Sequence, residues 1–202
     1  MLVIPDLDIY HHQTEARVKA YLNQPLTSGW RALDELRRHG LIKGVGAGIN
    51  EMGMIARFLD LVALDFFLVA YGYSLLTQEV LTKEFPQCAE REVSVIIGAA
   101  FASGILATGA VPGARYYYAP ASAEIMARAN RIEAICRQHK TPLPAAALQL
   151  LLAHPLVSAI IAGVLTPGHV QANVAMLQQP IPPVLWPELK AEGLLLADVP
   201  TL

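Results

Sequence analysis

The chain has 202 residues, a formal net charge of −2 at pH 7 and a hydrophobic content of 54 %. This length allows one domain with a substantial core, and the near-neutral charge argues against a nucleic-acid partner. Cys88 and Cys136 lack metal-ligand or redox spacing, and the first residues lack the basic start of a signal peptide. We therefore expect a cytoplasmic protein with reduced thiols.

Two long segments without Asp, Glu, Lys or Arg, residues 93–114 and 141–179, raise the question of a membrane. By length, each could cross a bilayer. Glycine and proline interrupt both segments, and strands of a parallel sheet also read as uncharged apolar runs because both of their faces are buried. We therefore expect no membrane insertion, and partition into detergent would favour the alternative.

Taken in chain order, the first half alternates between strand and helix patterns. Strands are predicted at residues 2–4, 42–46 and 66–70. Helices are predicted over residues 15–22, from a cap at Ser28 to the cations and glycine of 37–40, and from a cap at Asn50 with Glu51 in its first turn.

The second half continues the alternation. Its predicted elements are a helix over 78–85 stopped by Pro86, a strand at 93–97, helices over 122–139 and 144–153, a strand at 157–162, and a last regular helix over 167–177. Five strands alternating with helices over short connections indicate an α/β fold with a parallel sheet. We expect a single domain over residues 1–202 that ends in a tail, residues 179–202.

Three polar or aromatic groups could suggest a site. Adjacent His11 and His12 lack partners at metal-ligand spacing, so a loop pair is favoured and no metal is expected. Asp6 and Asp8 could form an acid/base pair, but strand-end polar residues are the favoured interpretation. The tyrosines at 116–118 are interpreted as loop residues, with a lid or substrate contact as the alternative.

Six segments together resemble the aldo-keto reductases, in particular the branch with L-fucose, D-threo-aldose and pyridoxal dehydrogenases. They are IPDLDIY (4–10), GWRALDELRRHGLIKGVGAGINE (29–51), DFFLVAYGYSLL (65–76), FPQCAEREVSVIIGAAFASGILATG (85–109), RIEAICRQHKTPLPAAALQLLLAHPLVSAIIAG (131–163) and LWPELKAEGLL (185–195). That family folds as a (β/α)8 TIM barrel. The resemblance implies that this chain supplies roughly strands 4 to 8 with their helices.

The resemblance also has implications for catalysis. The family uses an Asp, a Tyr, a Lys and a His, and the first three would precede Met1. The His falls at the end of the fourth strand, where this sequence has Pro5. Proline has no titratable group. By resemblance, the chain therefore carries no catalytic residue and is expected to be inactive alone.

The cofactor-binding part is better represented. By resemblance, the segment with Ala100, Phe101, Ser103, Gly104 and Leu106 wraps the cofactor pyrophosphate through backbone N–H groups. The segment with Gly163, Thr166, His169 and Asn173 holds the adenosine end, with Asn173 at the adenine edge.

The choice between NAD and NADP rests on the same segment. Relatives that prefer NADP have a Lys, a Ser or Thr, and an Arg, where this sequence has Gly163, Val164 and His169. A Lys and an Arg at these positions would bind the 2′-phosphate of NADP. Because this sequence has neither, NAD is the favoured cofactor.

The resemblance thus implies NAD(P)-dependent oxidation of an aldose or similar alcohol, or reduction of the carbonyl. A small sugar or aldehyde is the expected substrate. A partial barrel exposes two sheet edges, so self-association or pairing with an N-terminal half-barrel is expected. The alternative is a non-catalytic nucleotide-binding or interaction protein derived from the family.

Overall fold

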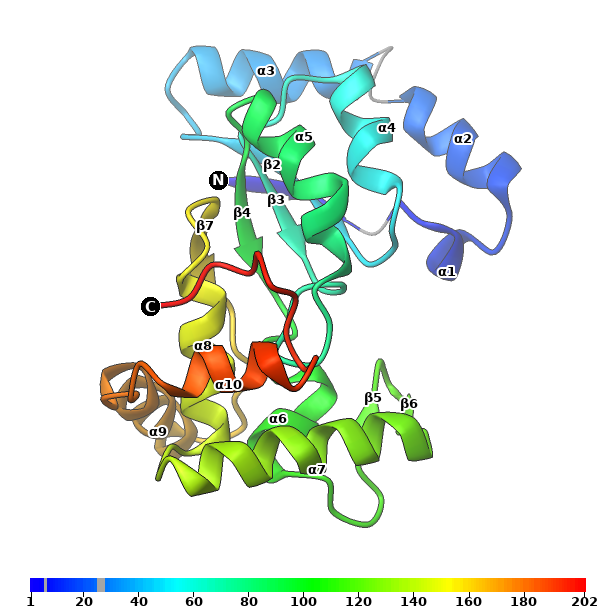
Figure 1. The fold of residues 1–202 in the computed structure, drawn as a ribbon. Helices are drawn as coiled ribbons and strands as arrows, with labels where there is room; N and C mark the ends of the chain where they lie inside the picture. The colour runs from blue at the N-terminus through cyan, green and yellow to red at the C-terminus, as the bar shows by residue number, and fades with distance from the viewer. Residues whose placement is uncertain (6, 25–27) are drawn as a thin grey trace.

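The computed structural model describes residues 1–5, 7–24 and 28–202 (Figure 1). The N-terminal elements are β1 (Leu2–Ile4), α1 (Ile9–His12), α2 (Glu15–Gln24), α3 (Trp30–Arg38), β2 (Val45–Ile49), α4 (Met54–Leu61) and β3 (Phe66–Val69). The central elements are η2 (Glu79–Thr82), α5 (Glu84–Glu90), β4 (Ser94–Ile97), η3 (Ala102–Gly104), α6 (Ile105–Thr108), β5 (Arg115–Tyr116) and β6 (Ala119–Pro120). The C-terminal elements are α7 (Ala123–Gln138), α8 (Leu143–Leu152), β7 (Val157–Ile160), α9 (Pro167–Gln178) and α10 (Leu185–Ala191).

A five-stranded sheet in the order β1-β2-β3-β4-β7 forms the centre of the fold, and all of its pairs are parallel. The predicted α/β class and the parallel sheet are therefore confirmed. Every residue of β2 is buried, as expected for a strand covered on both faces. Gly46 is required there, because a Cβ would come within 2.5 Å of the Phe66 ring.

The sheet is open at both sides, since β1 and β7 are its edge strands. Its parallel strand order and βα connections agree with a partial TIM barrel, in which neighbouring strands would continue from both edges. In the described part of the chain, no helix is long and apolar enough to cross a membrane.

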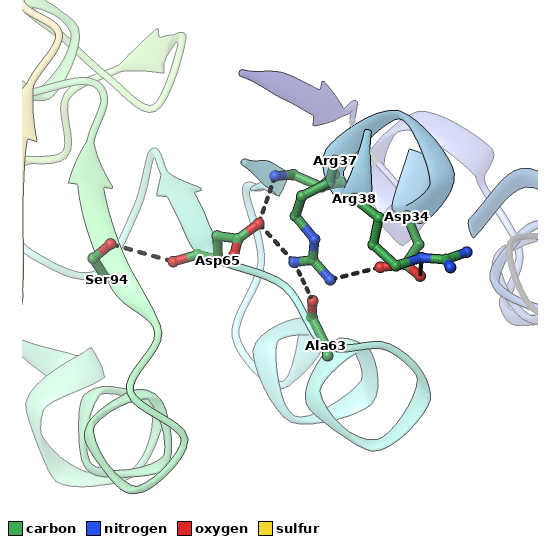
Figure 2. Close-up of polar contacts among 7 residues, drawn as sticks. Asp34, Arg37, Arg38, Ala63, Asp65 and Ser94 are labelled. Atoms are coloured by element: carbon green, nitrogen blue, oxygen red, sulfur yellow. Dashed lines mark hydrogen bonds and ion pairs between the residues drawn. The ribbon is translucent and has the colours of Figure 1, made fainter. Parts of the chain in front are cut away.

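A polar network lies at the amino ends of the strands (Figure 2). The Asp65 carboxylate, just before β3, accepts hydrogen bonds from the Val45 N–H at 2.7 Å and the Arg37 guanidinium at 2.8 Å. Arg37 also contacts Asp34 at 2.9 Å, and its hydrogen bonds to Asp65 and Asp34 raise the pKa of Arg37 above its usual value. Because ligands bind at the opposite edge in α/β folds, this network is structural.

Replacing Asp65 by alanine is expected to lower the free energy of unfolding by about 1–2 kcal/mol, because the Val45 N–H loses its side-chain acceptor and the Arg37 guanidinium loses one of its carboxylate partners. Urea denaturation measures the change. Asp60→Ala is the matched control, because Asp60 is 76 % exposed and lies 3.9 Å from Arg91, so its loss should change stability by less than about 0.5 kcal/mol. Equal losses in the two variants would contradict the assigned role of Asp65.

The C-terminal residues belong to an apolar cluster built on α7, α8 and α10, separate from the core around the sheet. Leu185, Trp186 and Leu189 of α10 are buried in it. Arg128 of α7 anchors the following residues by donating to the carbonyl of Leu194 at 2.6 Å. The prediction that regular structure ends with the helix over 167–177 is wrong, because residues 179–202 contain this packed helix.

Other observed boundaries of strands and helices differ from the predicted ones for local reasons. The strand predicted at 42–46 begins at Val45, because the Ile42 N–H still bonds to the Leu36 carbonyl at the end of α3. The helix over 78–85 divides into η2 and α5, and Pro86 lies in the first turn of α5, where no N–H partner is needed. The helix predicted over 122–139 is observed as α7, and the Oγ of Ser122 accepts the Ile125 N–H as its N-cap.

The two predicted caps are wrong. Gly29 precedes α3 without any side-chain cap, so Ser28 does not serve as one. Gly53, at a φ of +86°, precedes α4. Asn50 instead donates its side-chain amide to Asp8 at 3.1 Å.

Candidate functional site

The carboxyl ends of the five parallel strands meet at one edge of the sheet, the edge at which α/β enzymes bind their ligands. The segment 98–106 follows β4, and the segment 161–173 follows β7, the neighbouring strand. Both segments predicted to bind the cofactor therefore begin at the same edge.

The segment after β4 has an unusual backbone. Ala99, Ala102 and Ser103 adopt left-handed φ values of 48°, 48° and 61°, followed by Gly104 at 102°. Such conformations are costly for residues with a Cβ and are concentrated at functional sites. Nothing lies within 4 Å of where a Cβ on Gly104 would be, so the loop leaves open space over this residue.

The predicted residues of this loop are not equivalent. Ala100 and Leu106 are 1 % and 0 % exposed, so only their backbones could reach a ligand, while Ser103 is exposed. The N–H groups of Gly104 and Leu106 both donate to the carbonyl of Phe101. These two hydrogen bonds stabilise the conformation of the loop.

A small hairpin, β5–β6, links this loop to the one after β3. Tyr117 and Tyr118 form its tip with left-handed φ values of 45° and 64°. The Tyr118 N–H donates to Ser103 Oγ at 3.1 Å, and the Gly72 N–H donates to the Tyr117 hydroxyl at 2.7 Å. The tyrosines predicted as loop residues therefore form part of the candidate site.

The segment after β7 forms a capped helix start. Thr166 is the N-cap of α9, and its Oγ1 accepts the His169 N–H at 3.3 Å. The His169 ring accepts the Leu165 N–H through Nδ1 at 3.2 Å. Nothing lies within 4 Å of a Cβ added to Gly163, and Asn173 is half-buried one turn further along α9.

A buried carboxylate supports the ends of β2 and β3. Glu84, 3 % exposed, accepts hydrogen bonds from the Gly53 N–H at 2.6 Å and from the Tyr71 hydroxyl. Burial and the adjacent Glu84 raise the pKa of Tyr71, so the phenol stays protonated and donates a hydrogen bond to the carboxylate. Tyr71 is thus committed to a structural hydrogen bond.

The residues near β1 cap a helix. Asp8 is the N-cap of α1 and accepts the His11 N–H at 2.9 Å and the His11 ring at 2.7 Å. Burial raises the pKa of Asp8, but the hydrogen bonds from His11 and Asn50 outweigh it and hold this pKa below the usual value. The ring of His12 instead packs against the ring of Tyr21, with their centroids 4.5 Å apart. Asp6, the proposed acid/base partner, lies outside the described residues.

Pro5 directly follows β1 at the carboxyl edge of the sheet. That is the place at which catalytic side chains of barrel enzymes are found. A proline there contributes neither a proton nor a hydrogen-bond donor.

The two cysteines are expected to be unreactive in the folded protein. Burial raises the pKa values of Cys88 and Cys136 to about 12, and both side chains are 0 % exposed. At pH 8 both are therefore thiols, whereas the thiolate is the nucleophile. A chromogenic disulfide reagent should report no reaction at pH 8 until urea unfolds the chain and releases both thiols. Rapid labelling without urea would contradict this packing.

Sequence reasoning missed Glu84 and the hairpin contacts. Glu84 stands next to Phe85 and Pro86, and no local pattern marks it as buried. Its partners Gly53 and Tyr71 are 31 and 13 residues away, so the grouping appears only in the fold.

Comparison with known proteins identifies similar chains. The model of the aldo/keto reductase family matches residues 5–191. Pyridoxal 4-dehydrogenase from Microbacterium luteolum is 45 % identical over 168 residues, which are 83 % of this chain and 49 % of that protein. D-threo-aldose 1-dehydrogenase from a Pseudomonas species is 35 % identical over 182 residues, covering 90 % of this chain and 54 % of that protein.

Among solved structures, an aldo-keto reductase from Bacillus halodurans in its holo form matches with a TM-score of 0.63 at 24 % identity. The match covers 84 % of this chain and 56 % of that one, which supports the fold. The chain thus spans about half the length of the relatives it matches.

Proposed function

The chain belongs to the aldo/keto reductase family, and on that premise we propose that it supplies the cofactor-holding part of an NAD(P)-dependent oxidoreductase. The substrate class is an aldose or similar alcohol, or the corresponding carbonyl. The main support is the strained loop after β4, which leaves open space over Gly104 at the ligand-binding edge.

The loop and α9 have chemistry that fits a dinucleotide. We assign the pyrophosphate to the loop containing Ala100, Phe101, Ser103, Gly104 and Leu106, where glycine allows the backbone to approach a phosphate closely. We assign the adenosine end to Gly163, Thr166, His169 and Asn173, beside the N-terminus of α9. When bound, the nicotinamide would supply or accept the hydride.

In this assignment the chain's own residues bind and orient. Ser103 Oγ accepts the Tyr118 N–H at 3.1 Å and so ties the hairpin to the pyrophosphate loop. Tyr71 is engaged by Glu84 and cannot also act as the proton donor. Because Pro5 carries no proton, we propose that the isolated chain binds the cofactor without turning over a substrate. This absence of a titratable group also favours the second candidate, a non-catalytic nucleotide-binding protein.

The cofactor preference provides a direct experiment. We expect the chain to bind NADH more tightly than NADPH, because the segment 163–169 carries no Lys or Arg. The double variant Gly163→Lys/His169→Arg should bind NADPH about tenfold or more tighter, the effect of one charge-assisted hydrogen bond. A Lys at position 163 meets no atom within 4 Å at its Cβ, so the fold should tolerate it.

Fluorescence titration with each reduced cofactor measures these affinities. NADH affinity should stay within about twofold in the double variant, since NADH has no 2′-phosphate for the added cations. Equal or tighter NADPH binding by the unaltered chain would contradict the proposed NAD preference.

A further inference from the structure

A pocket that the proposed function does not use lies where the segment after β3, helix α7 and the C-terminal segment meet. Its volume is about 460 Å³, and its walls include residues of the segment 76–83, Arg128 and Leu196. This volume is typical of a small-molecule site. No described residue of the cofactor segments 98–106 and 161–173 lines it, so the pocket is separate from the site assigned to the cofactor.

Hydrogen bonds between distant segments fix the walls of this pocket. Gln78, 4 % exposed, donates its side-chain amide to the Ser74 carbonyl at 2.9 Å and accepts the Leu196 N–H at 3.3 Å. Arg128 donates from Nε to the carbonyl of Leu76 at 2.9 Å. Together these bonds join the segment after β3 to α7 and to the C-terminal segment. The pocket between the three is therefore formed by the fold before any ligand arrives.

Arg128 has a positive charge that these contacts do not neutralise. It is half-buried. In the described part of the chain its hydrogen bonds reach main-chain carbonyls and no carboxylate, the acceptors being Leu76, Gly193 and Leu194. Burial, and then the charge of Arg131, lower the pKa of Arg128 below its usual value. Because a partly buried cation without a carboxylate partner is costly, a bound anion would stabilise it.

Two more charged residues line the pocket. Lys83 follows η2 and is exposed, and within the described residues no carboxylate pairs with it. Glu79, at the start of η2, is the one carboxylate among the described lining residues. Two cations and one carboxylate favour a ligand with a single negative charge, since the second charge of a phosphate would face Glu79.

We propose that this pocket binds a small monocarboxylate with an apolar body. The three hydrogen bonds of Arg128 leave one N–H on Nη1 and one on Nη2, and a guanidinium donates such a pair to the two oxygens of a carboxylate. Lys83 adds a second positive charge, and Leu76 and Leu196 provide apolar surface. The proposal does not depend on the cofactor assignment, because the two sites share no described residue.

Titration of the full chain with benzoate, followed by nuclear magnetic resonance, tests the proposal. Benzoate should bind saturably and shift the amide signals of residues 76–83 and of Leu196. Benzamide has the same ring without the charge, and it should bind at least about tenfold more weakly, the effect of losing one charge-assisted hydrogen bond. Phenyl phosphate should also bind more weakly than benzoate, because Glu79 repels its second charge.

Four results would overturn the proposal. The first is the absence of saturable binding, and the second is equal binding of benzamide. The third is tighter binding of phenyl phosphate, which would indicate a phosphate site instead. The fourth is a set of signal shifts confined to the segments 98–106 and 161–173, which would place the anion at the cofactor site.

Matched variants locate the charge that binds the carboxylate. Lys83→Gln should weaken benzoate binding about threefold or more, the effect of one exposed ion pair, with an unchanged urea midpoint. Lys43→Gln is the control, because Lys43 is also exposed but lies between α3 and β2, outside the pocket. Its benzoate affinity should stay within about 1.5-fold. Equal benzoate affinity in the two variants would contradict the proposed site.

Arg128→Lys tests the paired N–H groups. It keeps the charge but cannot donate to both carboxylate oxygens in the same way, so benzoate binding should weaken about tenfold or more. Unchanged affinity in Arg128→Lys would overturn the role of the guanidinium. Because Arg128 also anchors the C-terminal segment, Lys83→Gln keeps the test decisive if Arg128→Lys unfolds.

Discussion

Replacement of Trp186 by alanine is expected to lower the free energy of unfolding by about 4 kcal/mol, within the range for removing a buried tryptophan. Trp186 is 1 % exposed and belongs to the apolar cluster of α7, α8 and α10. Its removal would leave a cavity between the C-terminal helix and the rest of the chain. Urea denaturation, comparing midpoint and slope, measures the loss.

Trp186→Phe separates packing from hydrogen bonding. In the described part of the chain the buried indole Nε1 has no hydrogen-bond partner, and such an orphaned donor is destabilising. Phenylalanine removes this donor and keeps most of the apolar volume, so the cost should stay within about 1.5 kcal/mol. Val184→Ala, at a position 59 % exposed beside the same helix, should change stability by less than about 0.5 kcal/mol. Unchanged stability in Trp186→Ala would show that residues 179–202 do not belong to the core.

Replacement of Gly104 by valine should weaken NADH binding by about 10- to 100-fold, because displacing the pyrophosphate from the loop would cost contacts about as strong as one charge-assisted hydrogen bond. The valine side chain would occupy the open space over the loop after β4, where we place the pyrophosphate. It would also strain the backbone, since Gly104 has a φ of +102°.

Gly40→Val controls for this strain. Gly40 has a φ of +71°, and nothing lies within 4 Å of its added Cβ, yet it ends α3, far along the chain from the cofactor segments. Both variants should lose about 1–3 kcal/mol of stability. NADH affinity should fall in Gly104→Val alone. Equal NADH affinity in the two variants would contradict the assignment of the pyrophosphate to this loop.

The sequence predicts the sheet well because its strands are short apolar runs with turn residues on both sides. Residues 66–69 and 94–97 lie within short apolar runs, and their length between turn residues favours a strand over a helix. The boundary error at β2 has a local cause, since Ile42 is apolar but its N–H completes the end of α3. The pattern of apolar residues cannot distinguish the first residue of a strand from a residue that completes the end of a helix.

The composition of residues 179–202 hides the helix that they contain. Prolines at 180, 182, 183 and 187 suggest an irregular segment, and Pro187 nevertheless lies in the first turn of α10, where proline is tolerated. Burial of Trp186 against α7 and α8 decides the outcome. These helices lie far from Trp186 along the chain, so the packing leaves no local signal in the sequence.

The candidate site was predictable in its location and not in its internal contacts. Segments that follow strands of a parallel sheet meet at its carboxyl edge, so the positions of Ser103 and Thr166 follow from the strand order. The hydrogen bond between Tyr117 and Gly72 spans 45 residues and depends on a hairpin that the periodicity does not reveal. The left-handed backbone at Ala102 and Ser103 was likewise unexpected, because glycine alone usually marks such conformations.

Titration of the full chain with NADH, followed in the same cuvette by addition of NAD⁺ with pyridoxal or an aldose, tests the proposed function most directly. We expect saturable one-to-one NADH binding, with loss of affinity in Gly104→Val and no substrate-dependent formation of NADH. A folded chain that binds no NADH would contradict the assignment of the cofactor segments. Turnover by the chain alone would contradict the proposal that the chain is inactive because Pro5 carries no titratable group.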